Sequence, residues 1–399
     1  MSVTPKIQAP SASQTPYSGR KLLRRFLNVV NIPLVLMAAA VTAFGLIVVW
    51  SATLGSTEYS FTRQLQGVAV GAVALGVFWR LDYHRFELLF LPLLILDVVV
   101  ILLPLLPFIG VTSHGAQSWV MIFGVQAQPG ELAKIITILF MASLVSRYRG
   151  RLDSGREYIK VSFVLLVPLA SIMLQPDLGT GLVFFAIGVA ILFTGGAHYK
   201  WLIASVVLLV FAVVGILTLD PILDQWAGHD VFIKDYQKNR LLVFMDETID
   251  PSGIGYNLKQ AKIAIGSGGL MGKGLTLGTQ SGLGFLPEAP TDFIFCVLAE
   301  ELGFLGSVSL IVVYGLLIFA ALRIALKASD LFGSLIVTGV IGMWIFQILE
   351  NIGMTCGLMP ITGIPLPFVS YGSSFMLVNF IALGLLLSVW THRTAKKEQ

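Results

Sequence analysis

Ten apolar runs follow one another along the chain, and mostly short polar segments separate them. A helix needs about 17–25 apolar residues to cross the hydrocarbon core of a bilayer, and the runs have about this length. The pattern predicts an all-α, polytopic integral membrane protein with about ten transmembrane helices. The runs lie at approximately 32–54, 64–79, 86–107, 131–146, 160–174, 178–196, 200–219, 302–324, 332–352 and 376–391.

The composition agrees with this pattern. The 399 residues are 56% hydrophobic and 12% charged, with a mean hydropathy of +0.86, whereas about a quarter of the residues in soluble domains are charged. We expect a disordered cytoplasmic tail at 1–30, rich in Ser, Pro and Gln, a membrane domain at 31–393 and a short cytoplasmic tail at 394–399. Cys296 and Cys356 suggest neither a disulfide framework nor a metal site.

The distribution of basic residues predicts the orientation. If the N-terminus is cytoplasmic and ten helices follow, the short outer loops at about 108–130, 175–177 and 353–375 contain no Lys or Arg. Short loops obey the positive-inside rule, so both termini are expected in the cytoplasm. The inner segments then hold 18 of the 26 Lys and Arg residues: Lys6, Arg20, Lys21, Arg24, Arg25, Arg80, Arg85, Arg147, Arg149, Arg151, Arg156, Lys160, Lys200, Arg323, Lys327, Arg393, Lys396 and Lys397.

With this orientation, the polar motifs collect on the outer side. They are "SHGAQSWV", "QPGELAK", "QPDLGT", "MPITGIPLPFVSYGSS" and a large extracytoplasmic loop at 220–301, between helices 7 and 8. A channel or an alternating-access transporter needs polar groups through the middle of its helices. Here the helix midsections are mostly apolar, with Asp97, Gln347 and Glu350 as exceptions. The pattern therefore favours a site at the outer face.

The large loop contains an amphipathic stretch, "YNLKQAKIAI", which predicts a helix over 256–265 that Gly266 ends. Lys259 and Lys262 lie on one face of this helix. That face is either solvated or binds phosphate. The next stretch, "GSGGLMGKG", does not fit a phosphate-binding P-loop. Its glycine spacing is wrong, and Gly274 stands after Lys273 where that motif has Ser or Thr. We expect its glycines to let backbone approach a bulky polar substrate or lipid, and Lys273 to supply a charge.

Four acids lie in "LPEAPTDFIFCVLAEELG" (286–303). Thr291 is a plausible N-cap, which places Asp292 in the first turn of the next helix. Glu300 and Glu301 then lie about 12 Å or more further along, too far for an acid/base pair with Asp292, so we interpret both as structural. Glu288, in the preceding loop, remains a possible neighbour of Asp292, and we expect it to shape the site and to contribute to substrate binding. The helix dipole favours the ionised form of Asp292 and burial near lipid raises its pKa. Whichever effect dominates, the carboxylate is expected to be able to accept a proton near neutral pH.

Two further groups of residues have open interpretations. Glu131 and Lys134 are three residues apart at the outer start of the fourth helix. They can form a structural salt bridge, bind substrate as a pair, or do both. The histidines are scattered, with no metalloprotease motif and no visible Ser-His-Asp arrangement. His114 and His229, on the predicted outer face, are interpreted as solvated loop residues.

Taken together, "LPEAPTDFIFCVLAEELGFLG", "IGSGGLMGKG", "GTQS", "QPDLGT", "QPGELAK" and "TGIPLPFVSYGSS" resemble the SEDS family (shape, elongation, division and sporulation) over about residues 30–393. The sequence around "QAKIAIGSGGLMGKG" is more similar to the RodA, elongation branch than to the FtsW, division branch. The family's essential aspartate falls in a motif that here reads "PTDFIF", which maps its role to Asp292. Its paired Glu and Lys map to Glu131 and Lys134. Pro290 replaces the usual His, and Gly130 the usual Ser.

The resemblance implies a peptidoglycan glycosyltransferase of the bacterial cytoplasmic membrane. Such enzymes polymerise lipid II into β-1,4-linked glycan strands with a class B penicillin-binding protein as partner. We expect the protein to contact membrane lipids and to have no nucleic-acid partner. Our hypothesis is that Asp292 acts as general base in an inverting transfer during cell elongation. Lys134, Arg240, Lys262 and Lys273 are candidate cations for the leaving diphosphate. A divalent cation, Mg²⁺ or Mn²⁺, would assist, and no organic cofactor is expected.

Alternatives remain open at this point. A lipid II flippase would need a polar groove from face to face, for which Asp97, Gln347 and Glu350 offer a weak start. A division-type, FtsW-like glycosyltransferase would share the chemistry. A non-catalytic scaffold would leave the outer carboxylates and lysines unexplained.

Overall fold

The structure is a computed structural model that describes residues 30–393, apart from 108, 114–115, 123–124, 228–234, 247 and 252. Most of the predicted N-terminal tail, the whole tail at 394–399, His114 and His229 lie outside the described residues.

Each of the ten apolar runs corresponds to a helix. Seven of the helices in the described part of the chain are long and apolar enough to cross a membrane, and α4 and α7 are shorter apolar helices. The predicted polytopic, mainly helical class is therefore confirmed. The ten helices are α2 (Ile32–Ala52), α3 (Phe61–Arg80), α4 (Phe90–Leu102), α5 (Pro129–Ser146), α6 (Gly155–Met173), α7 (Leu178–Thr194), α8 (Tyr199–Ala227), α12 (Ile294–Lys327), α13 (Leu331–Thr355) and α14 (Ser373–His392).

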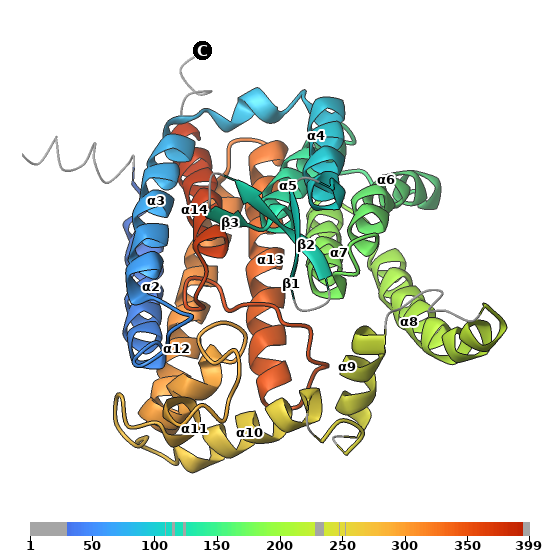
Figure 1. Ribbon diagram of the computed structural model, residues 1–399. Coiled ribbons are helices and arrows are strands. Elements are labelled where there is room, and N and C mark those ends of the chain that lie inside the picture. Colours follow the sequence, from blue (N-terminus) through green and yellow to red (C-terminus); the bar gives the residue numbers. More distant parts are fainter. Residues whose placement is uncertain are drawn as a thin grey trace, which may run out of the picture.

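The helices form a bundle with α13 near its centre (Figure 1). On one side of α13, α2 packs on α12 and α3 packs on α14, and on the other side lie α5 and α7. Glycines allow close approach in the α3–α14 pair, where a Cβ on Gly71 would lie 2.7 Å from the Phe380 ring. Most of α5 is buried, whereas α8 exposes large apolar side chains such as Leu208 and Phe211. Such a face is suited to lipid.

A small antiparallel sheet lies between α4 and α5 and was not predicted. Its strands are β1 (Gly110–Ser113), β2 (Ala116–Ile122) and β3 (Val125–Ala127), in the order β1-β2-β3. Ser118 and Val120 of β2 are buried and Met121 is exposed. This short alternation is typical of a strand, but it lies within a segment that we interpreted as a connecting loop.

The loop between α8 and α12 is shorter than predicted and contains three helices, α9 (Asp235–Met245), α10 (Ile254–Ser267) and α11 (Thr279–Gly282). The helices on both sides extend into the segment 220–301, because α8 continues to Ala227 and α12 begins at Ile294. The predicted end of α10 at Gly266 is wrong. The helix continues to Ser267, and the positive φ that ends such helices occurs at Gly269 (56°).

The two described ends of the chain lie at the same end of the bundle. Val30 to Pro33, before and in α2, line one pocket together with Trp390 of α14. This agrees with the prediction that both termini share a side of the membrane. That this side is the cytoplasm stays a prediction.

Candidate active site

Asp292 lies in a turn immediately before α12, not in its first helical turn. The helix begins at Ile294 with Phe293 as N-cap, so the predicted N-cap at Thr291 is wrong. The reason is that the Thr291 hydroxyl reaches back to Glu288, donating to its carboxylate (2.9 Å) and to its carbonyl (3.1 Å). Glu288 has a positive φ of 55°, which turns the chain here. A non-glycine residue in this region is strained by about 1–3 kcal/mol, and such strain often occurs at functional sites.

The Asp292 carboxylate shares its surroundings with Arg240 and Glu288. A Cβ placed on Gly363 would lie 2.9 Å from Asp292 Oδ2 and 3.4 Å from Arg240 Nη1, so both side chains lie against this glycine. Burial, followed by the negative charge of Glu288, raises the pKa of Asp292 to about 7, while Arg240 acts in the opposite direction. Among the described residues, no donor forms a hydrogen bond to this carboxylate. Asp292 is therefore placed to accept a proton near neutral pH.

The segment 360–372, which we call the hub loop, holds the site together. Its Thr362 carbonyl accepts from Arg240 (2.7 Å), and its Ile364 carbonyl accepts from Asn351 Nδ2 (2.8 Å). Asn351 also donates to the carbonyl of Asp292 (2.9 Å). The Ser370 hydroxyl donates to the Thr291 carbonyl (2.7 Å). These bonds fix the backbone on both sides of the Asp292 carboxylate.

Arg240 is positioned by α9. Gln237, one turn earlier, donates to the Pro176 carbonyl (2.8 Å) and ties α9 to the "QPDLGT" motif. That motif also touches the hub loop, because a Cβ on Gly179 would lie 3.2 Å from both the Thr362 carbonyl oxygen and the Ile364 side chain. Three motifs that are distant in sequence therefore meet around Asp292.

Glu350 of α13 is a site residue that we did not assign from the sequence. Its side chain is 1% exposed and accepts a hydrogen bond from the Thr362 hydroxyl. Its second oxygen, Oε2, has no partner among the described residues. The signal was present, because a carboxylate in an apolar helix is unusual, but the sequence did not show that Glu350 faces Thr362 and Arg240.

Tyr59 is a second residue that the sequence analysis missed. Its hydroxyl donates to Glu288 Oε2 (2.5 Å), and its ring meets Tyr371 edge-on, with centroids 5.2 Å apart. Burial and the Glu288 carboxylate raise the pKa of Tyr59, so the phenol stays a hydrogen-bond donor. Pro290, at the position of the family's usual His, is buried, and its carbonyl accepts from the Tyr371 amide (2.9 Å). No titratable side chain lies at that position.

Glu131 and Lys134 form the predicted ion pair, with Lys134 Nζ 2.5 Å from Glu131 Oε1. Both side chains are almost completely buried, and Glu131 Oε2 has no partner in the described structure. Lys134 also lies 5.9 Å from the centre of the Phe375 ring, near the end of the hub loop. A Cβ on Gly130 would meet only ordinary contacts, at 3.5 Å or more, with Ile172 and Thr180. A serine would fit here, so the departure from the family leaves this helix start intact.

Lys273 and Lys262 lie in different surroundings. Lys273 Nζ is 2.5 Å from Oε1 of Glu300, which is fully buried and also accepts from the amides of Thr279 (2.9 Å) and Gln280 (3.1 Å). Lys273 therefore holds the loop after α10 together, besides any contact with substrate. The end of the Lys262 side chain lies against Gly357, directly after α13.

Glu300 and Glu301 are structural, as predicted. Glu301 accepts from the Ser51 hydroxyl of α2 (2.5 Å), while Glu300 organises the loop at 273–280. In the described contacts, neither carboxylate forms a hydrogen bond or ion pair with Asp292, Arg240 or Glu288.

The other polar groups within the helices do not join into one groove in the described contacts. Asp97 of α4 accepts from the Thr137 hydroxyl of α5 (2.9 Å), whereas Glu350 is bound to the hub loop. Gln347 Oε1, one turn before Glu350, has no partner in the described part of the chain.

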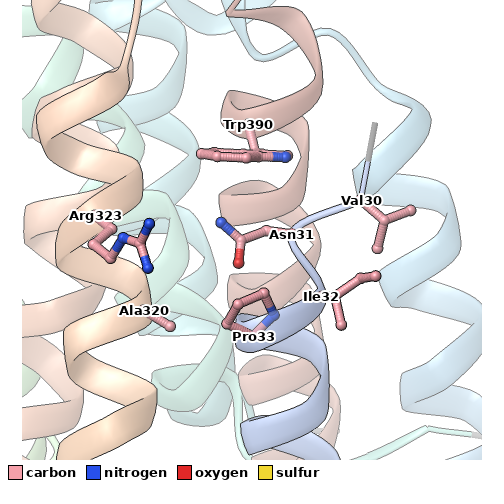
Figure 2. Close-up of a pocket in the computed structure, with 7 residues that line it drawn as sticks. All are labelled: Val30, Asn31, Ile32, Pro33, Ala320, Arg323 and Trp390. Atoms are coloured by element: carbon pink, nitrogen blue, oxygen red, sulfur yellow. The ribbon is translucent and has the colours of Figure 1, made fainter. Parts of the chain in front are cut away.

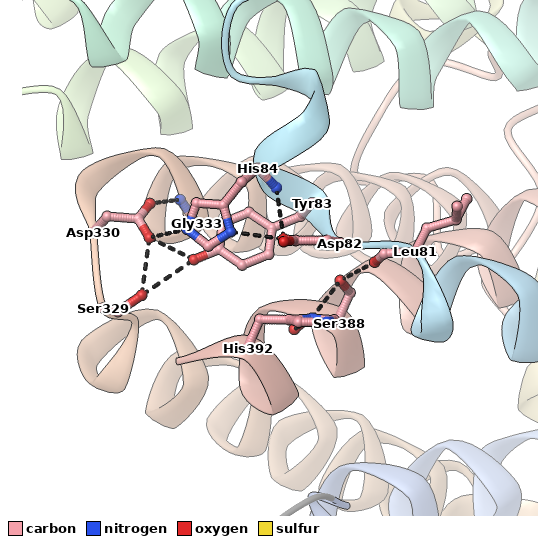
Figure 3. Close-up of polar contacts among 9 residues, drawn as sticks. All are labelled: Leu81, Asp82, Tyr83, His84, Ser329, Asp330, Gly333, Ser388 and His392. Carbon is pink, nitrogen blue, oxygen red and sulfur yellow. Dashed lines mark hydrogen bonds and ion pairs between the residues drawn. The ribbon is translucent and has the colours of Figure 1, made fainter. Parts of the chain in front are cut away.

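At the other end of α12, two polar sites lie far along the bundle from Asp292. One is a pocket of about 180 Å³ beside Arg323 (Figure 2). The other surrounds His84, whose ring nitrogens lie 2.7 Å from Asp82 and 3.1 Å from Asp330 (Figure 3). Asp330 also caps α13 and accepts from Tyr83 (2.5 Å), so this cluster joins the α3–α4 and α12–α13 connections and is structural.

Comparison with known proteins identifies relatives over almost the whole chain. The profile of the FtsW, RodA and SpoVE cell cycle proteins matches residues 32–395. The peptidoglycan glycosyltransferase MrdB of Escherichia coli K12 is 37% identical over 364 residues, which cover 90% of this chain and 93% of MrdB.

Solved structures give the same result. A chain of a peptidoglycan synthase complex, described as coordinating polymerization and crosslinking, superposes with a TM-score of 0.73 and 30% identity, covering 90% of this chain and 97% of that one. The rod shape determining protein RodA of Thermus thermophilus superposes with a TM-score of 0.64 and 28% identity, covering 90% and 96% of the two chains.

Proposed function

Because the chain belongs to the FtsW, RodA and SpoVE family of cell cycle proteins, we infer that it is a peptidoglycan glycosyltransferase of the bacterial cytoplasmic membrane. Its expected role is cell elongation, since its relatives include the rod shape determining protein RodA. The substrate that we propose is lipid II, polymerised at the outer face of the membrane.

We propose that Asp292 is the general base. The 4-hydroxyl of the acceptor GlcNAc attacks the anomeric carbon of the donor and gives its proton to the Asp292 carboxylate. The bond to the undecaprenyl diphosphate breaks, and the configuration inverts from α to β. The observation that carries this assignment is the Asp292 carboxylate itself, which accepts no hydrogen bond in the described structure and has a pKa raised to about 7. A base with a pKa near the working pH is the most effective one.

The leaving diphosphate needs positive charge, and Arg240 is the cation best placed to supply it. Its guanidinium lies against Gly363 beside Asp292, and its Nη1 donates to the Thr362 carbonyl. Lys134 lies beside the Phe375 ring, just after the hub loop, and Lys262 lies against Gly357, just before it, and we propose that both contribute electrostatically. Lys273 is tied to Glu300 and has a smaller part in this proposal.

A divalent cation, if used, would arrive with the diphosphate. The described residues contain no group of three or more His, Cys, Asp or Glu that could hold a metal ion. The carboxylates near Asp292 therefore do not fit a resident metal site, and the mechanism above includes no step through one.

A crosslinking partner follows from the reaction, because a glycan strand becomes wall material only after its peptides are joined. One similar chain belongs to a complex that coordinates polymerization and crosslinking. We propose a class B penicillin-binding protein as the partner of this chain.

The test is polymerisation of lipid II by the purified protein with and without such a partner. We expect glycan strands from the wild type and a loss of about 10²–10⁴-fold in rate for Asp292→Asn, which preserves shape and removes the base. The matched control is Asp246→Asn, a carboxylate of the same loop that bonds only to Thr248 in the described structure. Strand synthesis by Asp292→Asn at the wild-type rate would refute the assignment. Transport of labelled lipid II across liposomes without strand synthesis would favour a flippase.

A further inference from the structure

A pocket lies at the opposite end of α12 from Asp292, where the ends of three helices meet. It is lined by the start of α2, by Ala320 and Arg323 near the end of α12, and by Trp390 near the end of α14 (Figure 2). Its volume is about 180 Å³. One buried water needs roughly 10–15 Å³ of such space, so the pocket can hold a polar group of several heavy atoms.

The pocket carries hydrogen-bond donors without acceptors. Trp390 Nε1 is buried and has no partner in the described part of the chain. The same is true of Nη1 of Arg393, whose guanidinium carbon lies 3.1 Å from the centre of the Trp390 ring. Buried N–H groups in native proteins nearly always have partners. Trp390 lines the pocket and Arg393 stacks on Trp390 outside the lining, so the two unpartnered groups, one at the pocket and one beside it, point to a missing acceptor.

The charge around the pocket is positive. Arg323 lines it, Arg393 stacks on Trp390, and Lys327 Nζ lies 5.9 Å from the same ring. Across the described residues, none of these three cations has a carboxylate within ion-pair distance. The N-terminus of α2 adds a positive dipole end, and the Asn31 side chain, which accepts from the Leu34 amide, is directed into the pocket. The acceptor is therefore expected to be an anion.

The location indicates which anion. α2, α12 and α14 are long apolar helices of membrane-crossing length, so their ends lie at the boundary between hydrocarbon and water. Basic pockets between helix ends on the cytoplasmic side are suited to anionic headgroups. Ile32, an apolar side chain that lines the pocket and is exposed, is available to contact an acyl chain.

We propose that this pocket binds the phosphate of an anionic phospholipid in the cytoplasmic leaflet, separate from the substrate site. Arg323 and Trp390 Nε1 contact the phosphate, and Lys327 and Arg393 add to the attraction. Bound lipid would hold α2, α12 and α14 together at the end of the bundle away from Asp292.

The full-length protein, purified in a nonionic detergent, can be titrated with dihexanoylphosphatidylglycerol, dihexanoylphosphatidylcholine or inorganic phosphate. Lipid adducts are counted by native mass spectrometry, and stabilisation is read from thermal unfolding. We expect phosphatidylglycerol to bind more tightly than phosphatidylcholine, and added salt to weaken it. Arg323→Gln should weaken the binding about fivefold, as expected for one basic residue near a membrane surface.

Two matched controls separate this site from general membrane electrostatics. Arg147→Gln removes an exposed arginine that stacks on Phe90 and does not line the pocket, and Trp79→Phe removes an indole N–H that donates to Thr391. Both should bind phosphatidylglycerol like the wild type, whereas Trp390→Phe, which keeps a ring for Arg393, should bind it more weakly.

Equal binding of phosphatidylglycerol by wild type, Arg323→Gln and Trp390→Phe would overturn the proposal. So would a loss in Arg147→Gln as large as that in Arg323→Gln, or equal affinity for the two lipids. Binding of inorganic phosphate that depends on Arg323, without binding of phosphatidylglycerol, would show a phosphate site and refute the lipid. Displacement of phosphatidylglycerol by phosphate would support the proposed contact.

Discussion

Three carboxylates close together in the sequence have different surroundings. Glu300 accepts bonds from Lys273 and from the amides of Thr279 and Gln280, and Glu301 accepts one from Ser51. Asp292 accepts none from the described residues. Donors that surround a carboxylate stabilise the anion and weaken it as a proton acceptor. Asp292 is therefore the acid among these three that is available for proton transfer.

The raised pKa of Asp292 predicts how activity depends on pH. Only the ionised carboxylate accepts a proton, so the rate of polymerisation should rise with pH up to about 7 and then level off. Glu288 raises this pKa and Arg240 lowers it. Glu288→Gln should therefore move the acid limb of the pH–rate profile to lower pH, and Arg240→Gln to higher pH.

The measurement is the initial rate with saturating lipid II between pH 5 and 9. Lys259→Gln, an exposed lysine of α10, serves as a charge control and should leave the limb in place. If Glu288→Gln and Arg240→Gln moved the limb in the same direction, Asp292 would not be the titrating group.

Glu350 should act through Thr362 and not through its charge. Glu350→Gln keeps an acceptor oxygen for the Thr362 hydroxyl, so we expect a rate within about threefold of wild type. Glu350→Ala leaves that hydroxyl without its acceptor, which costs about 1–3 kcal/mol, and displaces the carbonyl that Arg240 binds. The rate should then fall at least about fivefold. Equal impairment of both variants would show that the carboxylate charge is required.

Asp292, Glu131 and Lys134 could be proposed from the sequence because they lie in short motifs. Tyr59 could not, because its contact with Glu288 spans 229 residues. A pairing over such a distance depends on how α2, α12 and α13 pack, which local patterns do not encode. Glu350 stands out in an apolar helix, but its contact with Thr362 depends on how the hub loop folds back onto α13.

The kink in α12 is an element-scale feature that depends on one glycine. Gly303 has φ 65° and ψ −162°, a region that essentially only glycine adopts. A Cβ on Gly303 would lie 2.2 Å from the Gly272 amide nitrogen, and the Phe304 amide donates to the Gly269 carbonyl (2.9 Å). The kink therefore docks the loop after α10 onto α12.

Gly303→Ala should destabilise the protein by at least about 2 kcal/mol, from backbone strain and overlap with the loop. Thermal unfolding in detergent measures this. Gly315→Ala is the matched control on the same helix, because a Cβ there meets nothing within 4 Å and alanine is the better helix former. It should be neutral or slightly stabilising. Equal unfolding temperatures for the two variants would contradict the importance of the kink.

The apolar runs predicted ten helices and the polytopic, mainly helical class well, since a run long enough to cross a bilayer has few alternatives. Helix ends and short strands were less predictable. Thr291 looked like an N-cap, but a positive φ at Glu288 redirected its hydroxyl. The sheet at β1–β3 consists of three strands of at most seven residues, too short for a clear alternation.

At the scale of the molecule, the two ends of the bundle differ. One end holds Asp292, Arg240 and the hub loop, and the other holds the His84 cluster and the pocket beside Arg323. A substrate with a diphosphate on a lipid fits the first end, which combines polar donors with a border of apolar helices. The function therefore requires that the first end face outward.

The charge pattern predicts this orientation, and cysteine labelling tests it. In a background with Cys296→Ala and Cys356→Ser, we would place single cysteines at two exposed positions, Lys259→Cys in α10 and Arg147→Cys after α5. A membrane-impermeant maleimide should label the first in intact spheroplasts and the second only after the membrane is opened, because short basic loops stay in the cytoplasm. The reverse labelling would place Asp292 in the cytoplasm, away from the growing wall, and would exclude polymerisation at the outer face.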